Sequence, residues 1–358
     1  MSFFSTRGGA AVTASQAILY GLAPDGGLYV PAMFPPISMK KIGELADMDY
    51  RQRACAILKT YLEDFSIPEI EAALNAAYDE RKFDDPAIAP VKKLDDETWV
   101  LELFHGPTSA FKDVALCMLP QLLTAARAVK SPDESILILT ATSGDTGKAA
   151  LEGFKDVDGI KICVFYPDGG VSDVQRRQMV SQEGENVTVC AVRGNFDDAQ
   201  TGVKNIFAAC KEMDLPFKLS SANSINIGRL APQITYYFKA YRDLLDAGKI
   251  TMGDMVNFSV PTGNFGNILA CYYAKCMGLP VNKLICASNR NRILTDFFET
   301  GVYDCNRPFY TTTSPSMDIL VSSNLERLLY TLSDAETVRG HMNELAACGK
   351  YVVSEQLK

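Results

Sequence analysis

The sequence is poor in the residues that metal sites and serine-hydrolase sites usually require. It contains only two histidines, His105 and His341, which excludes a multi-histidine metal site and leaves little for a Ser-His-Asp triad. Its ten cysteines are irregularly spaced and include no Cys-x-x-Cys pair, so zinc-ligand spacing is absent and no metal is expected. In a chain of this size without an export signal, we expect reduced, buried thiols rather than a disulfide framework.

Long apolar runs and an excess of positive charge are also missing. No run approaches the roughly 20 apolar residues that span a bilayer, and the N-terminus lacks the apolar segment of a secretory signal. The formal net charge of −8 disfavours nucleic-acid and anionic-membrane partners. We therefore expect a cytoplasmic protein with a small-molecule ligand, and its 358 residues suggest about two or three domains.

Near Trp99 the sequence pattern changes from mainly helical to an alternation of predicted strands and helices. Residues 50–60 and 68–80 have helical spacing, and the proline- and acid-rich segment 84–97 is predicted to be a linker. Further on, short apolar runs alternate with helix-length amphipathic segments, which predicts an α/β fold with parallel sheet covered by helices. The predicted strands are Trp99–Phe104, Ser135–Ala141, Lys161–Tyr166, Asn186–Val192, Lys218–Ser220, Val256–Val260 and Lys283–Ala287.

Ligands of such folds bind where strands end and helices begin, and the first unusual loop of this kind is Leu103–Asp113. It places Lys112 at the start of a predicted helix, where a cation opposes the helix dipole. A lowered pKa at that position would make the amine a better nucleophile and base. The alternative is a solvated surface lysine beside a capping Asp113.

Two further loops have the composition of anion sites. Residues 140–147, Thr-Ala-Thr-Ser-Gly-Asp-Thr-Gly, and residues 260–267, Val-Pro-Thr-Gly-Asn-Phe-Gly-Asn, each combine glycines with a following helix start. The first does not match a Walker A motif, and the second does not match the dinucleotide fingerprint Gly-x-Gly-x-x-Gly. The alternative for each is an ordinary turn between a strand and a helix.

The fourth loop, residues 221–229, brings Asn223, Ser224, Asn226 and Arg229 to another predicted helix start. An arginine one turn into a helix opposes the dipole unless an anion lies nearby. A capped helix with an exposed arginine is the alternative. Together, the loops give two or three anion sites and one unusually placed lysine, the combination that pyridoxal phosphate (PLP) requires.

In their sequences and their order along the chain, these loops resemble motifs of the threonine synthase family, PLP enzymes of fold type II. The motif around Lys112, Leu-Phe-His-Gly-Pro-Thr-x-Ala-Phe-Lys-Asp, resembles the family's cofactor-lysine motif, and the other three loops match in the same order. Ser5–Gly8, Asp25–Pro31 and Thr313–Ile319 resemble further family motifs, so the resemblance covers nearly the whole chain. It implies two parallel-type α/β domains around a cofactor cleft, and an N-terminal mainly helical domain.

The resemblance also implies a role for each loop. Lys112 would hold PLP as a Schiff base and then move protons on the substrate, O-phospho-L-homoserine, which becomes L-threonine by γ-elimination of phosphate and β-hydration. The cofactor phosphate would be cradled by Gly263, Asn264, Phe265, Gly266 and Asn267. The substrate carboxylate would be held, close to the cofactor's ring hydroxyl, by Thr142, Ser143, Asp145 and Thr146. The phosphate of the substrate would be bound by Asn223, Ser224 and Arg229.

Domain limits and alternatives follow from the same comparison. We expect an N-terminal domain over 1–97, a small domain over 135–215, and a large PLP-binding domain formed by 98–134 and 216–358. Family members extend beyond the equivalent of Lys358, so the resemblance implies that the C-terminal segment with the ring-nitrogen partner is missing. The alternatives are a phospho-lyase giving 2-oxobutyrate, a serine/threonine dehydratase, and a truncated chain with little activity. The oligomeric state expected is a monomer or homodimer.

Overall fold

The N-terminal region combines short helices with a two-stranded ribbon. The computed structural model describes residues 1–130, 133–142, 144–194, 196–210 and 213–358. Strand β1 (Phe3–Ser5) pairs antiparallel with β2 (Tyr29–Pro31). The helices of this region are α1 (Ala14–Tyr20), α2 (Met39–Glu44), α3 (Tyr50–Tyr61) and α4 (Ile67–Ala77). Thr13, Asp49 and Ser66 begin three of them with capping boxes, which satisfy the first free N–H groups.

The segment expected to be a linker contains a strand, which corrects the sequence interpretation. Strand β3 (Val91–Lys93) forms an antiparallel hairpin with β4 (Trp99–Leu101), so the run at Trp99 is shorter than expected and is not parallel. The acidic residues between them build the turn: the Asp95 carboxylate accepts hydrogen bonds from the backbone of Glu97 and Thr98 at 2.9 and 2.7 Å. The polar composition that indicated a linker therefore belongs to a hairpin turn.

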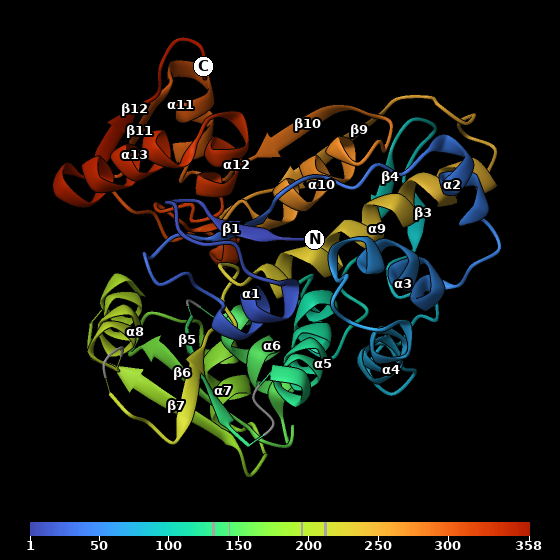
Figure 1. The fold of residues 1–358 in the computed structure, drawn as a ribbon. Helices are drawn as coiled ribbons and strands as arrows, with labels where there is room; N and C mark the ends of the chain where they lie inside the picture. Colours follow the sequence, from blue (N-terminus) through green and yellow to red (C-terminus); the bar gives the residue numbers. More distant parts are fainter. Residues whose placement is uncertain (131–132, 143, 195, 211–212) are drawn as a thin grey trace.

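A four-stranded parallel sheet forms the lower part of the molecule in Figure 1. Its order is β7-β6-β5-β8, with all neighbours parallel, as the consecutive apolar runs predict. The strands are β5 (Ser135–Ala141), β6 (Ile160–Pro167), β7 (Val187–Val192) and β8 (Phe217–Ser220), and the connecting helices are α6 (Asp145–Phe154), α7 (Asp173–Val180) and α8 (Phe196–Cys210). Because parallel strands end at one edge, the loops after β5 and β8 lie together.

The rest of the chain packs on the other side of these loops. The long helices α5 (Asp113–Lys130) and α9 (Ile227–Asp246) contact each other, and α9 also contacts α10 (Gly266–Cys276). Strands β9 (Val256–Pro261) and β10 (Val281–Ala287) form a parallel pair, whereas β11 (Val302–Asp304) and β12 (Lys350–Val352) are antiparallel. The remaining elements are α11 (Ile293–Thr300), the 3-10 turn η1 (Pro315–Met317), α12 (Leu325–Leu332) and α13 (Ala335–Cys348).

The first residues of the chain are fastened to α12, more than 300 residues later in the sequence. The guanidinium of Arg7 donates to both carboxylate oxygens of Glu326 at 2.9 Å, and Thr6 donates to one of them at 2.6 Å. A bidentate pair of this kind is geometrically specific. The N-terminal motif thus fixes the helix that lies behind two of the candidate ligand-binding loops.

A glycine sets the distance between the two helices that begin at the candidate site. Gly153 of α6 lies against the backbone of α5, and an added Cβ would sit 2.1 Å from the carbonyl oxygen of Leu116. Leu116 is four residues before Pro120, whose ring removes the N–H that this carbonyl would otherwise accept. Lys112 immediately precedes α5, and Asp145 begins α6, so this close contact governs how near those two side chains come.

We expect Gly153→Ala to lower the free energy of unfolding by about 1–3 kcal/mol, because backbone atoms cannot yield to the new methyl group. This loss should outweigh the gain in helix propensity of about 1 kcal/mol. Gly202→Ala is the matched control: Gly202 lies inside α8, and no described atom is within 4 Å of an added Cβ. Urea unfolding should show a lower stability for the first variant and a higher one for the second; equal stabilities would contradict the packing argument.

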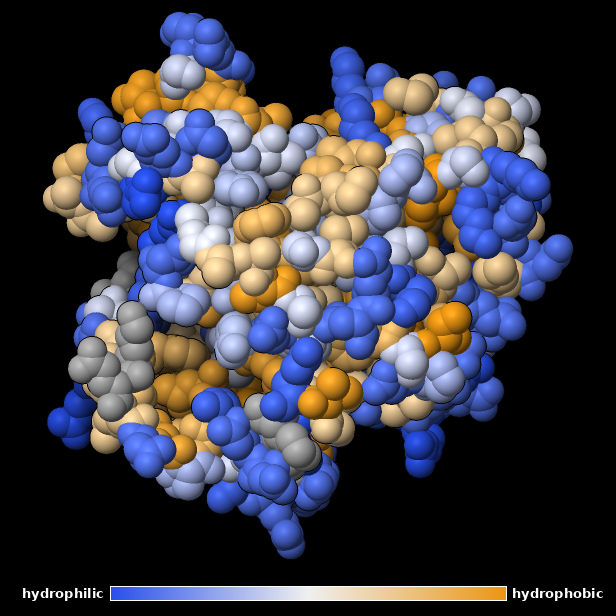
Figure 2. Space-filling view, in the orientation of Figure 1, coloured by the Kyte–Doolittle hydropathy of each residue, from blue (hydrophilic) through white to orange (hydrophobic). Residues whose placement is uncertain are grey.

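The surface mixes polar and apolar residues. Figure 2 shows polar side chains over the periphery, apolar residues across the middle of this face, and a hollow between the C-terminal elements and the four-stranded sheet. Within the residues that the structure describes, no helix is both long and apolar enough to cross a membrane.

Candidate active site

One cavity gathers residues from all four loops that the sequence singled out. It lies where the loops after β5 and β8 meet the start of α10 and the turn η1. Its walls are formed by Phe111, Lys112, Thr146, Asn223, Ser224, Arg229, Gln233, Pro261, Thr262, Gly263, Asn264, Phe265, Gly266, Asn267, Ser316 and Met317. The spatial clustering of loops separated by more than 100 residues is what a ligand-binding cleft of an α/β fold requires.

Lys112 is a buried lysine and not a surface one. Its side chain packs over the ring of Phe111, 4.5 Å from the centroid, and the residue is 7% exposed. Its Nζ donates to the carboxylate of Asp145 at 2.6 Å. Burial lowers the pKa of Lys112, and Asp145 opposes that shift only in part. A buried amine with a lowered pKa is poised to act as a nucleophile or a base.

The loop before Lys112 is closed by its own side chains. The buried carboxylate of Asp113 accepts hydrogen bonds from the backbone and hydroxyl of Thr108 at 2.8 and 2.6 Å. His105 lies between two carboxylates, with Nδ1 2.6 Å from Asp84 and Nε2 3.0 Å from Glu102. The turn that presents Lys112 is therefore held at both ends, which explains why the motif contains these polar residues.

In the loop after β5, Asp145 and Thr146 have different environments from Thr142. Thr142 is buried, and its hydroxyl accepts hydrogen bonds from the backbone of Gly144 and Gly147 at 2.9 and 2.8 Å. It shapes the loop and is not among the residues that line the cavity. Thr146 lines the cavity, and Asp145 reaches Lys112. Ser143, also expected to bind ligand, lies outside the described residues.

The loop after β8 carries an arginine that is buried rather than exposed. Arg229 is 3% exposed and donates from Nη1 to the carbonyl of Ala222 at 2.8 Å, while its Nε has no partner among the described residues. Burial lowers its pKa to about 10. Asn223 and Ser224 line the same cavity. A buried guanidinium with an unused donor is suited to an anionic ligand.

The glycine-rich loop after β9 leaves the start of α10 open. Phe265 adopts the left-handed conformation, with φ of 65°, and within the described part of the chain no side chain caps the helix. Gly263 allows close packing: an added Cβ would lie 3.1 Å from both Ile319 Cγ1 and Met317 Cα. Uncapped N–H groups at a helix start are a ready anion site, and a left-handed non-glycine residue indicates a functional constraint.

The two asparagines of this loop fasten it to neighbouring elements. The Asn267 side chain accepts hydrogen bonds from the hydroxyls of Tyr236 and Tyr237, the latter at 2.7 Å. The backbone carbonyl of Asn264 accepts from the backbone and side-chain N–H groups of Asn324, both at 3.1 Å. These contacts fix the loop against α9 and α12, so its conformation is set before any ligand arrives.

Sequence reasoning missed several residues that line the cavity. Ser316 and Met317 come from η1, and Gln233 comes from the second turn of α9. A signal was present for the first two, because they lie inside the Thr313–Ile319 motif, to which no site role was assigned. Gln233 had no such signal, since a polar residue in an amphipathic helix is usually solvent-exposed.

Comparison with known proteins identifies the class. The threonine synthase N-terminal family matches residues 2–78, and the pyridoxal-phosphate-dependent enzyme family matches residues 86–354. The chain is 42% identical to threonine synthase of Pseudomonas aeruginosa over 99% of its own length and 74% of the relative's. It is 44% identical to human threonine synthase-like 1 over 90% of its own length, but spans only 45% of that protein.

Solved structures agree with this class. The PLP-bound threonine synthase of Brucella melitensis is 42% identical, with a TM-score of 0.89, covering 100% of this chain and 75% of the other. The yeast enzyme is 35% identical with the same TM-score, covering 99% of this chain and 74% of the other. The fold is thus that of fold type II PLP enzymes, as expected from the sequence. Within that class, the chain belongs to the threonine synthase family.

The residues present fit the cofactor of this family, PLP. Lys112 provides a buried amine at the cavity wall, and the uncapped start of α10 provides N–H groups for a phosphate. Gly263 lets this loop pack closely against Ile319 and Met317 at the cavity wall. Arg229, whose Nε has no partner among the described residues, lines the same cavity and provides a second cationic group for an anion.

Proposed function

We propose that this chain forms the active site of a threonine synthase, which converts O-phospho-L-homoserine and water to L-threonine and phosphate. One observation carries the proposal: two buried cationic side chains, Lys112 and Arg229, line one cavity, and the Nε of Arg229 has no partner among the described residues. The amine suits attachment of PLP, and the guanidinium suits the phosphate ester of the substrate. A serine/threonine dehydratase would have no substrate phosphate to occupy the second position.

Lys112 and the start of α10 are the proposed cofactor site. PLP, when bound, supplies an electron sink for negative charge that develops on the substrate carbons. Lys112 attaches the cofactor and, when released, moves protons among Cα, Cβ and Cγ of the substrate. Gly263–Asn267 hold the cofactor phosphate, which is supported by the uncapped start of α10.

The other loops are the proposed substrate site. Arg229, Asn223 and Ser224 bind the substrate phosphate, which offsets the cost of burying the guanidinium. Ser143 and Thr146 bind the substrate carboxylate. The buried Thr142 acts indirectly, by accepting hydrogen bonds from the backbone of Gly144 and Gly147 and so holding the start of α6, where Thr146 lies. Asp145 aligns Lys112 through their ion pair.

The proposed domain arrangement places this cavity between two bodies. Residues 135–215 form the small domain, and residues 98–134 with 216–358 form the large one, beside an N-terminal domain over 1–97. Closure of the cleft between them excludes water from the reacting groups. The protein acts in the cytoplasm, as a monomer or homodimer, on a small-molecule substrate.

Product analysis of the PLP-loaded protein tests the proposal. With O-phospho-L-homoserine, we expect phosphate and L-threonine in equal amounts, measured by a phosphate assay and by amino-acid chromatography. Formation of 2-oxobutyrate in place of L-threonine would make the protein a phospho-lyase, because elimination would then not be followed by hydration. An absence of phosphate release from a PLP-loaded sample would contradict any activity of this chain on that substrate.

A further inference from the structure

Ser316 connects the C-terminal region to Asp145 of α6, the ion-pair partner of Lys112. Its hydroxyl donates to Oδ2 of Asp145, the same oxygen that accepts the hydrogen bond from Lys112 Nζ at 2.6 Å. Ser316 belongs to η1 and Asp145 to α6, 171 residues earlier. Asp145 is therefore held from two sides by groups on different parts of the fold.

The loop that carries Ser316 is tied together by a buried carboxylate. Asp318 is 6% exposed and accepts hydrogen bonds from the backbone of Thr312 at 2.9 Å and from its hydroxyl at 2.8 Å. Its Oδ1 also accepts from the side-chain amides of Asn289 and Asn291 at 2.7 and 3.0 Å. These four donors close residues 312–318 into a compact turn and join it to the segment after β10.

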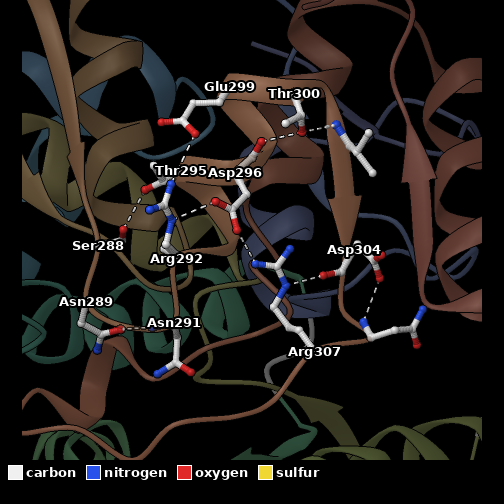
Figure 3. Close-up of polar contacts among 12 residues, drawn as sticks. Ser288, Asn289, Asn291, Arg292, Thr295, Asp296, Glu299, Thr300, Asp304 and Arg307 are labelled. Carbon is white, nitrogen blue, oxygen red and sulfur yellow. Dashed lines mark hydrogen bonds and ion pairs between the residues drawn. The ribbon is translucent and has the colours of Figure 1, made fainter.

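That segment is itself fixed to its surroundings. Asn291 receives a hydrogen bond from the backbone of Tyr310 at 2.9 Å and donates to its carbonyl at 2.7 Å. Figure 3 shows that Asn291 also donates from its backbone to the side chain of Asn289, at 2.9 Å. In the same view Asp296 of α11 accepts from Arg292 at 2.8 Å and from Arg307 at 2.6 Å. The turn that carries Ser316 is thus joined to a segment that is itself held by hydrogen bonds to Arg307 and Tyr310.

We propose that Ser316 is a further positioning residue of the active site, which aims the Asp145 carboxylate at Lys112, and that Asp318 acts through Ser316 by holding its turn in place. The inference rests on the proposed function, because it assigns the orientation of the lysine that takes PLP. A hydroxyl that donates to one carboxylate oxygen restricts the rotation of that carboxylate. Without it, Oδ2 of Asp145 keeps only the ion pair with Lys112, while Oδ1 still accepts from the Thr146 backbone at 2.8 Å, so the carboxylate loses the one side-chain hydroxyl that aligns Oδ2 with Nζ.

The charges around Lys112 give this orientation a measurable consequence. Among the described residues, the charged groups that act on the amine are Asp145 on α6, Arg229 on α9, and Asp113 at the start of α5. Burial and Arg229 lower the pKa of Lys112, whereas the two carboxylates raise it. A carboxylate that turns away from Nζ therefore leaves the amine neutral at lower pH.

Capture of PLP by the apoprotein tests the inference without relying on turnover. The rate at which the visible absorbance of bound PLP appears should rise with pH as Lys112 loses its proton. Asp145→Asn should move this profile to lower pH by about one unit or more. Ser316→Ala should move it in the same direction by a smaller amount, and Ser316→Thr, which keeps the hydroxyl, should restore the wild-type profile.

Two further variants separate positioning from general damage. Thr313→Ala is the matched control, since Thr313 is exposed and lies in the same loop outside the cavity lining; its profile should equal the wild type. Asp318→Asn should shift the profile like Ser316→Ala, and the double variant should shift it no further. A profile for Ser316→Ala that matches the wild type, or one that Ser316→Thr does not restore, would overturn the inference alone. A wild-type protein that captures no PLP would overturn the proposed function as well.

Discussion

Replacing Lys112 with alanine should abolish covalent capture of PLP and leave the purified protein colourless. The amine of Lys112 is buried at the cavity wall, and burial lowers its pKa, which favours the neutral amine that attacks an aldehyde. In the wild-type protein, PLP should give a visible absorbance band, and borohydride should attach it to the peptide containing Lys112, as detected by mass spectrometry. Turnover should fall by at least about 10²–10⁴-fold through the lost proton transfers alone.

Lys148→Ala is the matched control for this experiment. Lys148 lies on α6, one turn from Asp145, where it pairs with Glu152 at 3.0 Å and does not line the cavity. Its removal should leave the band and the labelled peptide unchanged. Borohydride labelling of a different lysine, or a persistent band in Lys112→Ala, would show that PLP is held elsewhere.

Much of the fold and the positions of the four loops could be predicted from local sequence patterns. Consecutive apolar runs identified the strands of the parallel sheet, and β5 was placed at Ser135–Ala141 as observed. The position of Lys112 before a helix also followed from the sequence. These predictions succeeded because each rests on a short stretch of chain whose pattern is decided by burial on both faces or by a helix start.

The remaining features depend on partners that are distant in the sequence. The burial of Arg229 and Lys112 is imposed by packing, so their local sequences could not distinguish them from solvated cations. The contact between Ser316 and Asp145 joins two ends of the fold, and no local periodicity indicates it. The hairpin at β3 was missed for a different reason, since its short, charged strand has too few apolar residues to form a pattern.

Arg229→Met should weaken substrate binding strongly while leaving the apoprotein at least as stable as the wild type. If the guanidinium binds the substrate phosphate, its loss costs about 2–5 kcal/mol of binding, which raises KM at least about thirtyfold. Among the described residues, by contrast, this buried guanidinium makes one hydrogen bond, from Nη1, has no partner for Nε, and interacts electrostatically with Asp145. Replacing such a group by an apolar side chain of similar length should be neutral, or should stabilise by about 1–4 kcal/mol.

Arg327→Met is the matched control, because it removes a buried arginine whose guanidinium nitrogens all donate hydrogen bonds to the protein. Arg327 is equally buried, but its guanidinium donates to the carbonyls of Tyr29, Ser224 and Ile225 and to the Asn324 side chain. Removing it leaves these acceptors without donors, and should cost at least about 3 kcal/mol in urea unfolding. Steady-state kinetics and unfolding of both variants decide the matter. If Arg229→Met destabilises as much as Arg327→Met with KM unchanged, Arg229 supports the fold. Opposite effects on stability, together with a raised KM for Arg229→Met, mean that Arg229 is kept for a phosphate ligand.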